Sequence, residues 1–126
     1  MTCKDLIGYQ LVSIDDEKII VRKGDKEFTL GIRQDHGDCC GFNEITTELF
    51  ISNEELNRNP IITNVEIDEA EDQESDGSNG RLTFFGEYAP IASVTSYSSS
   101  GSGWCYGACV TIECKMLKIN DTLSSW

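Results

Sequence analysis

The feature that most constrains the fold is an alternation of apolar and polar residues interrupted by a glycine turn. In residues 27–33, Phe28, Leu30 and Ile32 alternate with polar residues or glycine. A period of two is typical of a β-strand with one buried face. Residues 9–14 and 18–23 have comparable patterns, and Gly24 suits the hairpin turn that would join residues 18–23 to residues 27–33. The sequence therefore predicts a three-stranded meander over residues 9–33.

Most of the remaining chain also has strand character. Further β-type segments cover residues 61–71, 81–88, 91–97 and 104–116, whereas residues 42–51 fit either a strand or a helical turn. A capping-box pattern that begins at Ser52 predicts a short helix over residues 53–58, which must end before Pro60. Residues 72–80 and 98–103 are polar and are predicted to be turns. The expected fold is mostly β or α+β, with antiparallel sheets built from meanders and one short helix.

The length of 126 residues predicts one domain over residues 1–126, whose last residues, 120–126, are expected to fray unless Trp126 docks. No run of residues approaches the roughly 20 apolar residues of a membrane span. The first residues lack the apolar stretch of a signal peptide. We therefore expect a cytoplasmic protein without a membrane partner.

The chain is strongly acidic, with 22 acidic and ten basic residues and a net charge of −12. Nucleic acids bind to cationic surfaces, because these release counterions from the phosphates. Direct binding of DNA or RNA is therefore not expected. An acidic surface could instead occupy the basic, nucleic-acid-binding surface of another protein. The alternative is that the charge only keeps the protein soluble.

The residues most suggestive of chemistry lie in the segment HGDCC, which contains His36, Asp38, Cys39 and Cys40. A histidine three or four residues before a cysteine could lower the pKa of the thiol and make it a nucleophile. Cysteine–histidine enzymes, however, normally assemble the pair from distant segments and orient the base with a third group. We expect reduced and mostly buried cysteines, with Asp38 capping backbone N–H groups, and no enzyme activity.

Ion sites are only weakly indicated. Cys39, Cys40, Cys105 and Cys109, together with His36, could supply zinc ligands, but an extended strand would hold Cys105 and Cys109 about 13 Å apart. Residues 72–77 resemble the start of an EF-hand loop, yet position twelve is a threonine rather than a glutamate. The glycine- and serine-rich residues 98–103 could line an anion site. We expect no cofactor and no metal.

Aromatic residues gather in the C-terminal half of the sequence, near an arginine. Stacking rings and a cation suit a nucleotide-like ligand, although the same residues could simply form a sheet core. The candidate ligand-binding residues are His36, Arg33, Arg81, Tyr88, Tyr97, Trp104 and Tyr106. Phe84, Phe85 and Arg58 are neighbouring candidates for the same role.

The order of these motifs resembles a family of small bacteriophage proteins to which no activity is attached. The resemblance covers about residues 5 to 114 and includes DLIGYQLVSI, H-x-DCC, the Pro60-Ile61 pair and GRLTFFGEYAPIASVTSY. The pair Trp104 and Tyr106 beside the Gly-Ser loop belongs to it as well. The family pattern has a tryptophan-containing strand where this chain has residues 81–85, and it lacks four of the cysteines (Cys3, Cys105, Cys109 and Cys114). A zinc site that combines both cysteine groups would therefore not be a family property.

The resemblance implies a phage-encoded protein in the cytoplasm of an infected bacterial host. The expected function is non-enzymatic binding, in which the protein opposes antiviral defence by sequestering a nucleotide-derived signal. One alternative is an acidic protein that masks a basic nucleic-acid-binding surface on a host or phage protein. Another is a Cys/His enzyme or zinc-binding protein. The expected partners are thus a small nucleotide-like ligand or a basic host protein, and a homo-oligomer is left open.

Overall fold

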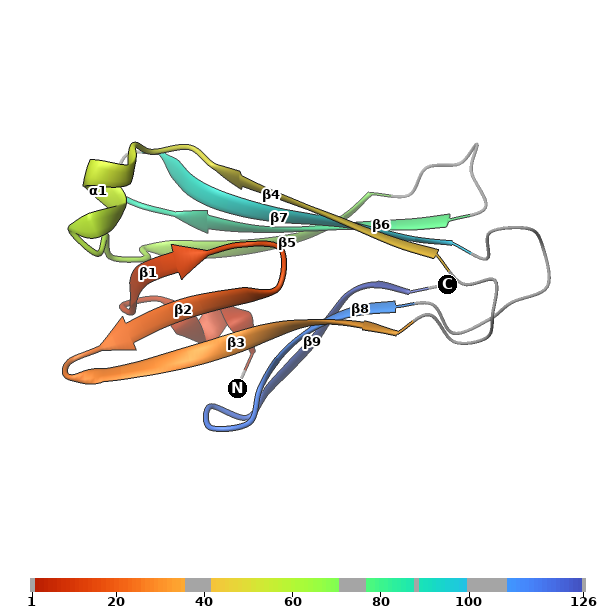
Figure 1. The fold of residues 1–126 in the computed structure, drawn as a ribbon, viewed down its shortest axis with the longest axis horizontal. Coiled ribbons are helices and arrows are strands. Elements are labelled where there is room, and N and C mark those ends of the chain that lie inside the picture. Colours follow the sequence, from red (N-terminus) through yellow and green to blue (C-terminus); the bar gives the residue numbers. More distant parts are fainter. Residues whose placement is uncertain (1, 36–41, 71–76, 88, 100–108, 126) are drawn as a thin grey trace.

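The chain folds into two antiparallel β-sheets that face each other, as the computed structural model shows (Figure 1). The structure describes residues 2–35, 42–70, 77–87, 89–99 and 109–125. The predicted class, mostly β with one short helix, is confirmed. None of the helices in these ranges is long and apolar enough to cross a membrane.

Sheet A contains five strands in the order β1-β2-β3-β8-β9. The strands are β1 (Gln10–Ile14), β2 (Lys18–Lys23), β3 (Lys26–Asp35), β8 (Cys109–Cys114) and β9 (Ile119–Ser125). The first three form the predicted meander, and Gly24 has the positive φ of 63° that its turn requires. The carboxylate of Asp15 accepts backbone N–H bonds from Glu17 and Lys18 and so closes the turn between β1 and β2. These bonds lower the pKa of Asp15.

Sheet B contains four strands in the order β4-β7-β6-β5. The strands are β4 (Phe42–Leu49), β5 (Asn64–Ala70), β6 (Gly77–Phe85) and β7 (Pro90–Ser99). The segment that fitted either a strand or a helical turn is thus mostly strand β4. The part of the predicted turn from Gly77 onward belongs to β6, which pairs with both β5 and β7.

The predicted helix forms as α1 (Asn53–Asn57), and Ser52 caps it by accepting a hydrogen bond from the backbone N–H of Glu55 at 3.2 Å. A second, 3-10 helix, η1 (Cys3–Leu6), precedes β1. After α1, the chain reverses direction at Asn59, whose φ is 52°. The backbone of Ile62 exchanges hydrogen bonds with Gly8 and Tyr9, which ties the start of sheet A to the segment before β5.

Apolar side chains from both sheets form one buried core. Its largest fully buried members are Phe84, Leu6, Leu11, Ile19, Leu30, Ile62, Leu82, Ile112, Ile119, Leu123, Val21 and Val94. Phe84, one of the neighbouring candidates for ligand binding, is therefore a core residue. Near this core a polar contact joins the two sheets: the buried hydroxyl of Ser124 in β9 lies 2.9 Å from that of Ser96 and 2.7 Å from that of Ser98, both in β7.

The expectation that residues 120–126 fray is wrong for residues 120–125. They belong to β9, which pairs with β8, and Leu123 is 2 % exposed. Between Val110 and Thr111 the register shifts, so that β9 contains one residue more than its partner at this point. This bulge lets Leu123 and Ser124, which are adjacent, both be buried. Trp126 lies outside the described residues.

Candidate functional site: the acidic face of sheet B

The negative charge of the chain is concentrated in one half of the fold. Residues 42–99, which supply all of sheet B and α1, contain 12 of the 22 acidic residues but only Arg58 and Arg81 of the ten basic ones. They therefore carry a net charge of −10 out of the total of −12. The segments that form sheet A and η1 are close to neutral. The part of the sequence that supplies sheet B is thus much more acidic than the part that supplies sheet A.

Alternation along the strands determines which of these acidic residues share a surface. In β4, Glu44, Thr46 and Glu48 are exposed, whereas the residues between them are half-buried. In β5, Val65 is buried and Glu66 and Asp68 are exposed. Glu44, Glu48, Glu66 and Asp68 therefore point away from the core on the same side of sheet B. We call this surface the acidic face.

The strand register arranges the acidic face in rows that run across the four strands. One row is Glu48–Ser93–Thr83–Glu66, the next is Thr46–Thr95–Arg81–Asp68, and a third contains Glu44, Tyr97 and Asn79. Successive rows lie about 6.6 Å apart along the strands, and neighbouring strands about 4.8 Å apart. The edge strands β4 and β5 thus present carboxylates on both sides of a polar central strip, which contains Arg81 and in which Ser93 and Thr83 are buried.

Among the residues that the structure describes, no ion pair joins the four carboxylates to a cation. Within the described part of the chain, none of them takes part in an ion pair or a side-chain hydrogen bond. Arg81 is directly opposite Asp68 in the register, yet no ion pair within 4.0 Å joins the two. Among the described residues, the acidic face therefore exposes four carboxylates and one guanidinium, that of Arg81, to solvent.

Two of the predicted ligand-binding residues, Arg81 and Tyr97, lie on this same face. Arg81 is exposed and Tyr97 is half-buried, and they occupy diagonal positions on β6 and β7. Diagonal neighbours on adjacent strands are within reach of long side chains, at roughly 7–8 Å. The structure thus places these two residues near each other, but on an open sheet surface flanked by carboxylates.

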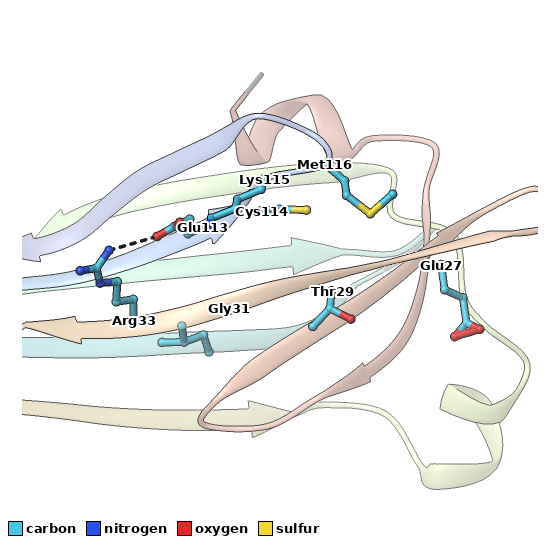
Figure 2. Close-up of a pocket in the computed structure, with 9 residues that line it drawn as sticks. Glu27, Thr29, Gly31, Arg33, Glu113, Cys114, Lys115 and Met116 are labelled. Carbon is cyan, nitrogen blue, oxygen red and sulfur yellow. Dashed lines mark ion pairs between the residues drawn. The ribbon is translucent and has the colours of Figure 1, made fainter.

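Arg33, a third predicted ligand-binding residue, lies on the opposite outer surface of the sandwich. It projects from β3 in sheet A, and its guanidinium is 3.6 Å from the carboxylate of Glu113 in β8 (Figure 2). Both residues line a hollow of about 480 Å³ whose rim also includes the exposed Met116. Arg33 therefore does not join Arg81 and Tyr97 in a single site. The hollow in Figure 2 is lined by both acidic and basic residues, so it favours neither an anionic nor a cationic ligand.

The other predicted site residues lie outside the described residues. They are His36, Tyr88, Trp104 and Tyr106, together with the weak metal candidates Cys39, Cys40 and Cys105. The remaining metal candidate, Cys109, is half-buried at the start of β8. Among the residues with assigned positions, no group of three or more His, Cys, Asp or Glu side chains could hold a metal ion.

Cys3 is the buried thiol with the clearest electrostatic environment. It is fully buried in η1, and its backbone N–H donates to the carboxylate of Asp121 in β9 at 2.6 Å. Burial raises the pKa of the Cys3 thiol, and so do a hydrogen bond of the thiol itself to the Asp121 carboxylate and the charge of that carboxylate. A thiol in this environment stays protonated and is a poor nucleophile.

Comparison with family models, with curated proteins and with solved structures gave no match. The acidic face is therefore defined by its geometry alone. Sequence reasoning identified acidic character but not these four residues. A signal was present in the sequence: VEID in β5 alternates apolar and acidic residues, and NEITTEL in β4 has Glu44 and Glu48 four residues apart, which places both on one face of a strand. What the sequence lacked was the strand order that brings the two patterns to opposite edges of one surface.

Proposed function

We propose that this protein is a non-enzymatic binding protein whose acidic face occupies the basic, nucleic-acid-binding surface of another protein. The observation that supports this best is the concentration of charge: sheet B and its connections carry −10 of the net −12, and Glu44, Glu48, Glu66 and Asp68 share one exposed surface. Nucleic-acid-binding surfaces are rich in Lys and Arg. Complementary potentials speed the encounter of such surfaces and fix their orientation.

The shape of the acidic face agrees with this function. A four-stranded sheet is a broad support whose paired strands fix the backbone positions that bear the carboxylates before a partner arrives. Little backbone entropy is then lost on binding, which favours affinity. The hydroxyl groups of the exposed Thr46 and Thr95 lie among the carboxylates and can accept hydrogen bonds from guanidinium or ammonium groups.

Sequestration of a nucleotide-derived signal is less well supported by the described residues. Arg81 and Tyr97 would have to bind phosphates and a base beside four exposed carboxylates, which repel an anion. Arg33 is on the other outer surface. The resemblance to bacteriophage proteins suggests a setting for the masking function: the cytoplasm of an infected bacterium, where the protein would block a host or phage protein that binds nucleic acid.

The experiment measures binding of a short, fluorescein-labelled Lys- and Arg-rich peptide by fluorescence anisotropy, at low and at physiological ionic strength. The test variant replaces the acidic face (Glu44→Gln, Glu48→Gln, Glu66→Gln and Asp68→Asn). The control variant removes the same number of charges from exposed positions of sheet A and its turns (Asp16→Asn, Glu17→Gln, Asp25→Asn and Glu27→Gln).

We expect binding that weakens as salt rises, because exposed charges are screened over about 8–10 Å at physiological ionic strength. The acidic-face variant should lose about tenfold or more in affinity, and the control variant much less. Equal losses in the two variants would show that net charge, not this face, determines binding. A second assay follows labelled duplex DNA bound to purified basic bacterial proteins. The wild-type protein should release the duplex from at least one of them, and failure with all of them would contradict masking.

A further inference from the structure

A hollow at one end of sheet B continues the acidic face toward helix α1. It has a volume of about 800 Å³ and lies among the segment after β4, the segment before β5 and the turn between β6 and β7. The lining residues are Phe50, Ile51, Glu55, Pro60, Ile61, Thr63, Gly86, Glu87, Ala89, Pro90 and Ile91. We call this hollow the end cleft.

The end cleft is contiguous with the acidic face through β4 and β7. Phe50 is two residues beyond Glu48, and its backbone N–H donates to the carbonyl of Ile91 at 2.9 Å, which extends the β4–β7 ladder by one step. Ile91 itself is buried at the start of β7, where the register between β6 and β7 shifts. A partner segment that lies along the acidic face would therefore reach the end cleft without leaving the surface of sheet B.

Apolar side chains in the end cleft are unusually exposed. Phe50 is 47 % exposed and Ile61 is 56 % exposed, and both belong to the cleft lining. Isolated exposed apolar residues are common on proteins, whereas two that line one hollow form a candidate interaction site. Elsewhere in the described chain, the large apolar residues with comparable exposure are Ile7 and Met116, and neither lines the cleft.

The walls of the end cleft are held by hydrogen bonds. The backbone N–H of Thr63 donates to the carbonyl of Phe85 at 2.8 Å, and its hydroxyl donates to the carbonyl of Gly86 at 2.6 Å. Gly86 in turn donates to the carbonyl of Ala89 at 2.9 Å. A Cβ on Gly86 would lie 2.8 Å from a methyl carbon of Ile91, so glycine allows the close packing of this wall. The cleft is thus preformed.

Charge complementarity indicates what the end cleft would bind. Its lining includes two carboxylates, Glu55 and Glu87, both exposed, and no lysine or arginine among the described residues. An apolar floor with acidic residues at its rim matches an apolar side chain that is flanked by basic ones. It matches an anionic ligand or an acidic peptide poorly.

We infer that the basic partner inserts apolar side chains into the end cleft while its Lys and Arg residues contact the acidic face. This inference rests on the proposed function and adds to it the type of partner segment, namely a cationic peptide segment with adjacent apolar residues such as Leu-Phe. Interfaces commonly combine a few buried apolar anchors with a charged rim, and the anchors dominate the affinity. The acidic face supplies attraction and orientation, and the cleft supplies selectivity among basic proteins.

The experiment uses two labelled peptides of equal length and charge. Both consist of Lys and Ser residues around a central pair, which is Leu-Phe in one peptide and Ala-Ala in the other. Anisotropy titrations measure the affinity of each peptide for the wild-type protein. We expect the Leu-Phe peptide to bind about tenfold more tightly, as removal of an anchor typically costs more than 1 kcal/mol and about 1.4 kcal/mol corresponds to tenfold.

Two variants test whether that preference comes from the end cleft. Phe50→Ser with Ile61→Ser removes the exposed apolar surface, and Ala89→Trp fills the cleft from an exposed position. Both should bind the two peptides about equally. The control, Ile7→Ser with Met116→Ser, removes comparable apolar surface elsewhere and should retain the preference. Circular dichroism establishes whether each variant is folded. If Phe50→Ser with Ile61→Ser does not fold, Ala89→Trp alone tests whether the end cleft causes the preference.

The outcomes separate this inference from the proposed function. If the wild-type protein binds both peptides equally well, the cleft is not an anchor site, although the acidic face still binds cations. If it binds neither peptide, the proposed function fails. If sedimentation shows a dimer that is lost in Phe50→Ser with Ile61→Ser, the cleft is filled by a second copy of the chain and the inference is overturned.

Discussion

Gly80 in β6 lies against the main chain of Leu123 in β9, so that a Cβ at position 80 would overlap the carbonyl group of Leu123. At this point the two sheets are in contact through main-chain atoms of both strands. Neither strand can retreat without disturbing its own ladder, because β6 pairs on both sides and β9 pairs with β8. The absence of a side chain at Gly80 thus sets how closely the sheets approach here.

Replacing Gly80 with alanine should therefore destabilise the protein more than its small change in volume suggests. Extra atoms in a well-packed interior typically cost about 1–3 kcal/mol, and an overlap with backbone belongs at or above the upper end. Thermal and urea unfolding of Gly80→Ala measure the effect. Gly31→Ala is the control, because its Cβ would lie 3.8 Å from the nearest atom, an ordinary contact. Equal stability of the two variants would contradict the close approach.

The positions of most strands could be predicted from the sequence, because alternation is a local signal. Residues 9–33 fold as the expected meander, and Ser52 caps the helix that its pattern predicts. The pairing of β3 with β8 was not predictable in this way. Those strands are far apart in the chain, and their register depends on how the whole core packs rather than on either pattern alone.

Strand β9 was not predicted from the sequence because the bulge in it disturbs the alternation of buried and exposed residues. Ile119 and Leu123 are buried but are separated by three polar residues, and Ser124 is buried directly after Leu123. An extra residue in one strand breaks the period of two on which the prediction relied. The polarity of residues 120–125 also favoured an exposed tail. Ser124 is nevertheless buried, because its hydroxyl contacts those of Ser96 and Ser98.

The candidate site could be predicted only in part. The excess of acidic residues was visible, but the three predicted ligand-binding residues that the structure describes are divided between two outer surfaces, with Arg33 on one and Arg81 and Tyr97 on the other. Sequence order gave no indication of this division, because it depends on which sheet each strand joins. The end cleft has no sequence signature, since Phe50 follows β4, Ile61 precedes β5 and Ile91 belongs to the start of β7.

Leu123→Ala tests whether β9 is an integral strand. The Leu123 side chain is 2 % exposed in the shared core, and truncation of a buried leucine typically costs about 2–5 kcal/mol. A frayed tail would instead tolerate the change. Urea unfolding gives the free energy of unfolding, and Thr122→Ala, at an exposed position of the same strand, serves as the control. A loss below about 0.5 kcal/mol, the range of neutral surface substitutions, would contradict the buried position.

Ser124→Ala should destabilise the protein by about 1–3 kcal/mol, because it leaves buried hydroxyls in β7 without their shared partner. Ser96 loses its 2.9 Å contact, whereas Ser98 keeps its 2.6 Å bond to the side-chain oxygen of Asn43. The double variant Ser96→Ala with Ser124→Ala should therefore lose less stability than the two single variants added together. A thermodynamic cycle from urea unfolding measures this coupling, and strict additivity would argue against the contact.

Thiol labelling tests the environment of the cysteines in sheet A and η1. Cys3 and Cys114 are buried and Cys109 is half-buried. Burial and the Asp121 carboxylate raise the pKa of Cys3, so the reactive thiolate is scarce near pH 8, at which an unperturbed cysteine is partly ionised. Iodoacetamide should therefore modify Cys109 well before Cys3 and Cys114 in the native protein, as followed by mass spectrometry of the labelled peptides. In concentrated guanidinium chloride the rates should become similar. Native labelling of Cys3 as fast as Cys109 would show that the thiol is neither buried nor held protonated, and that η1 does not pack against β9 as described.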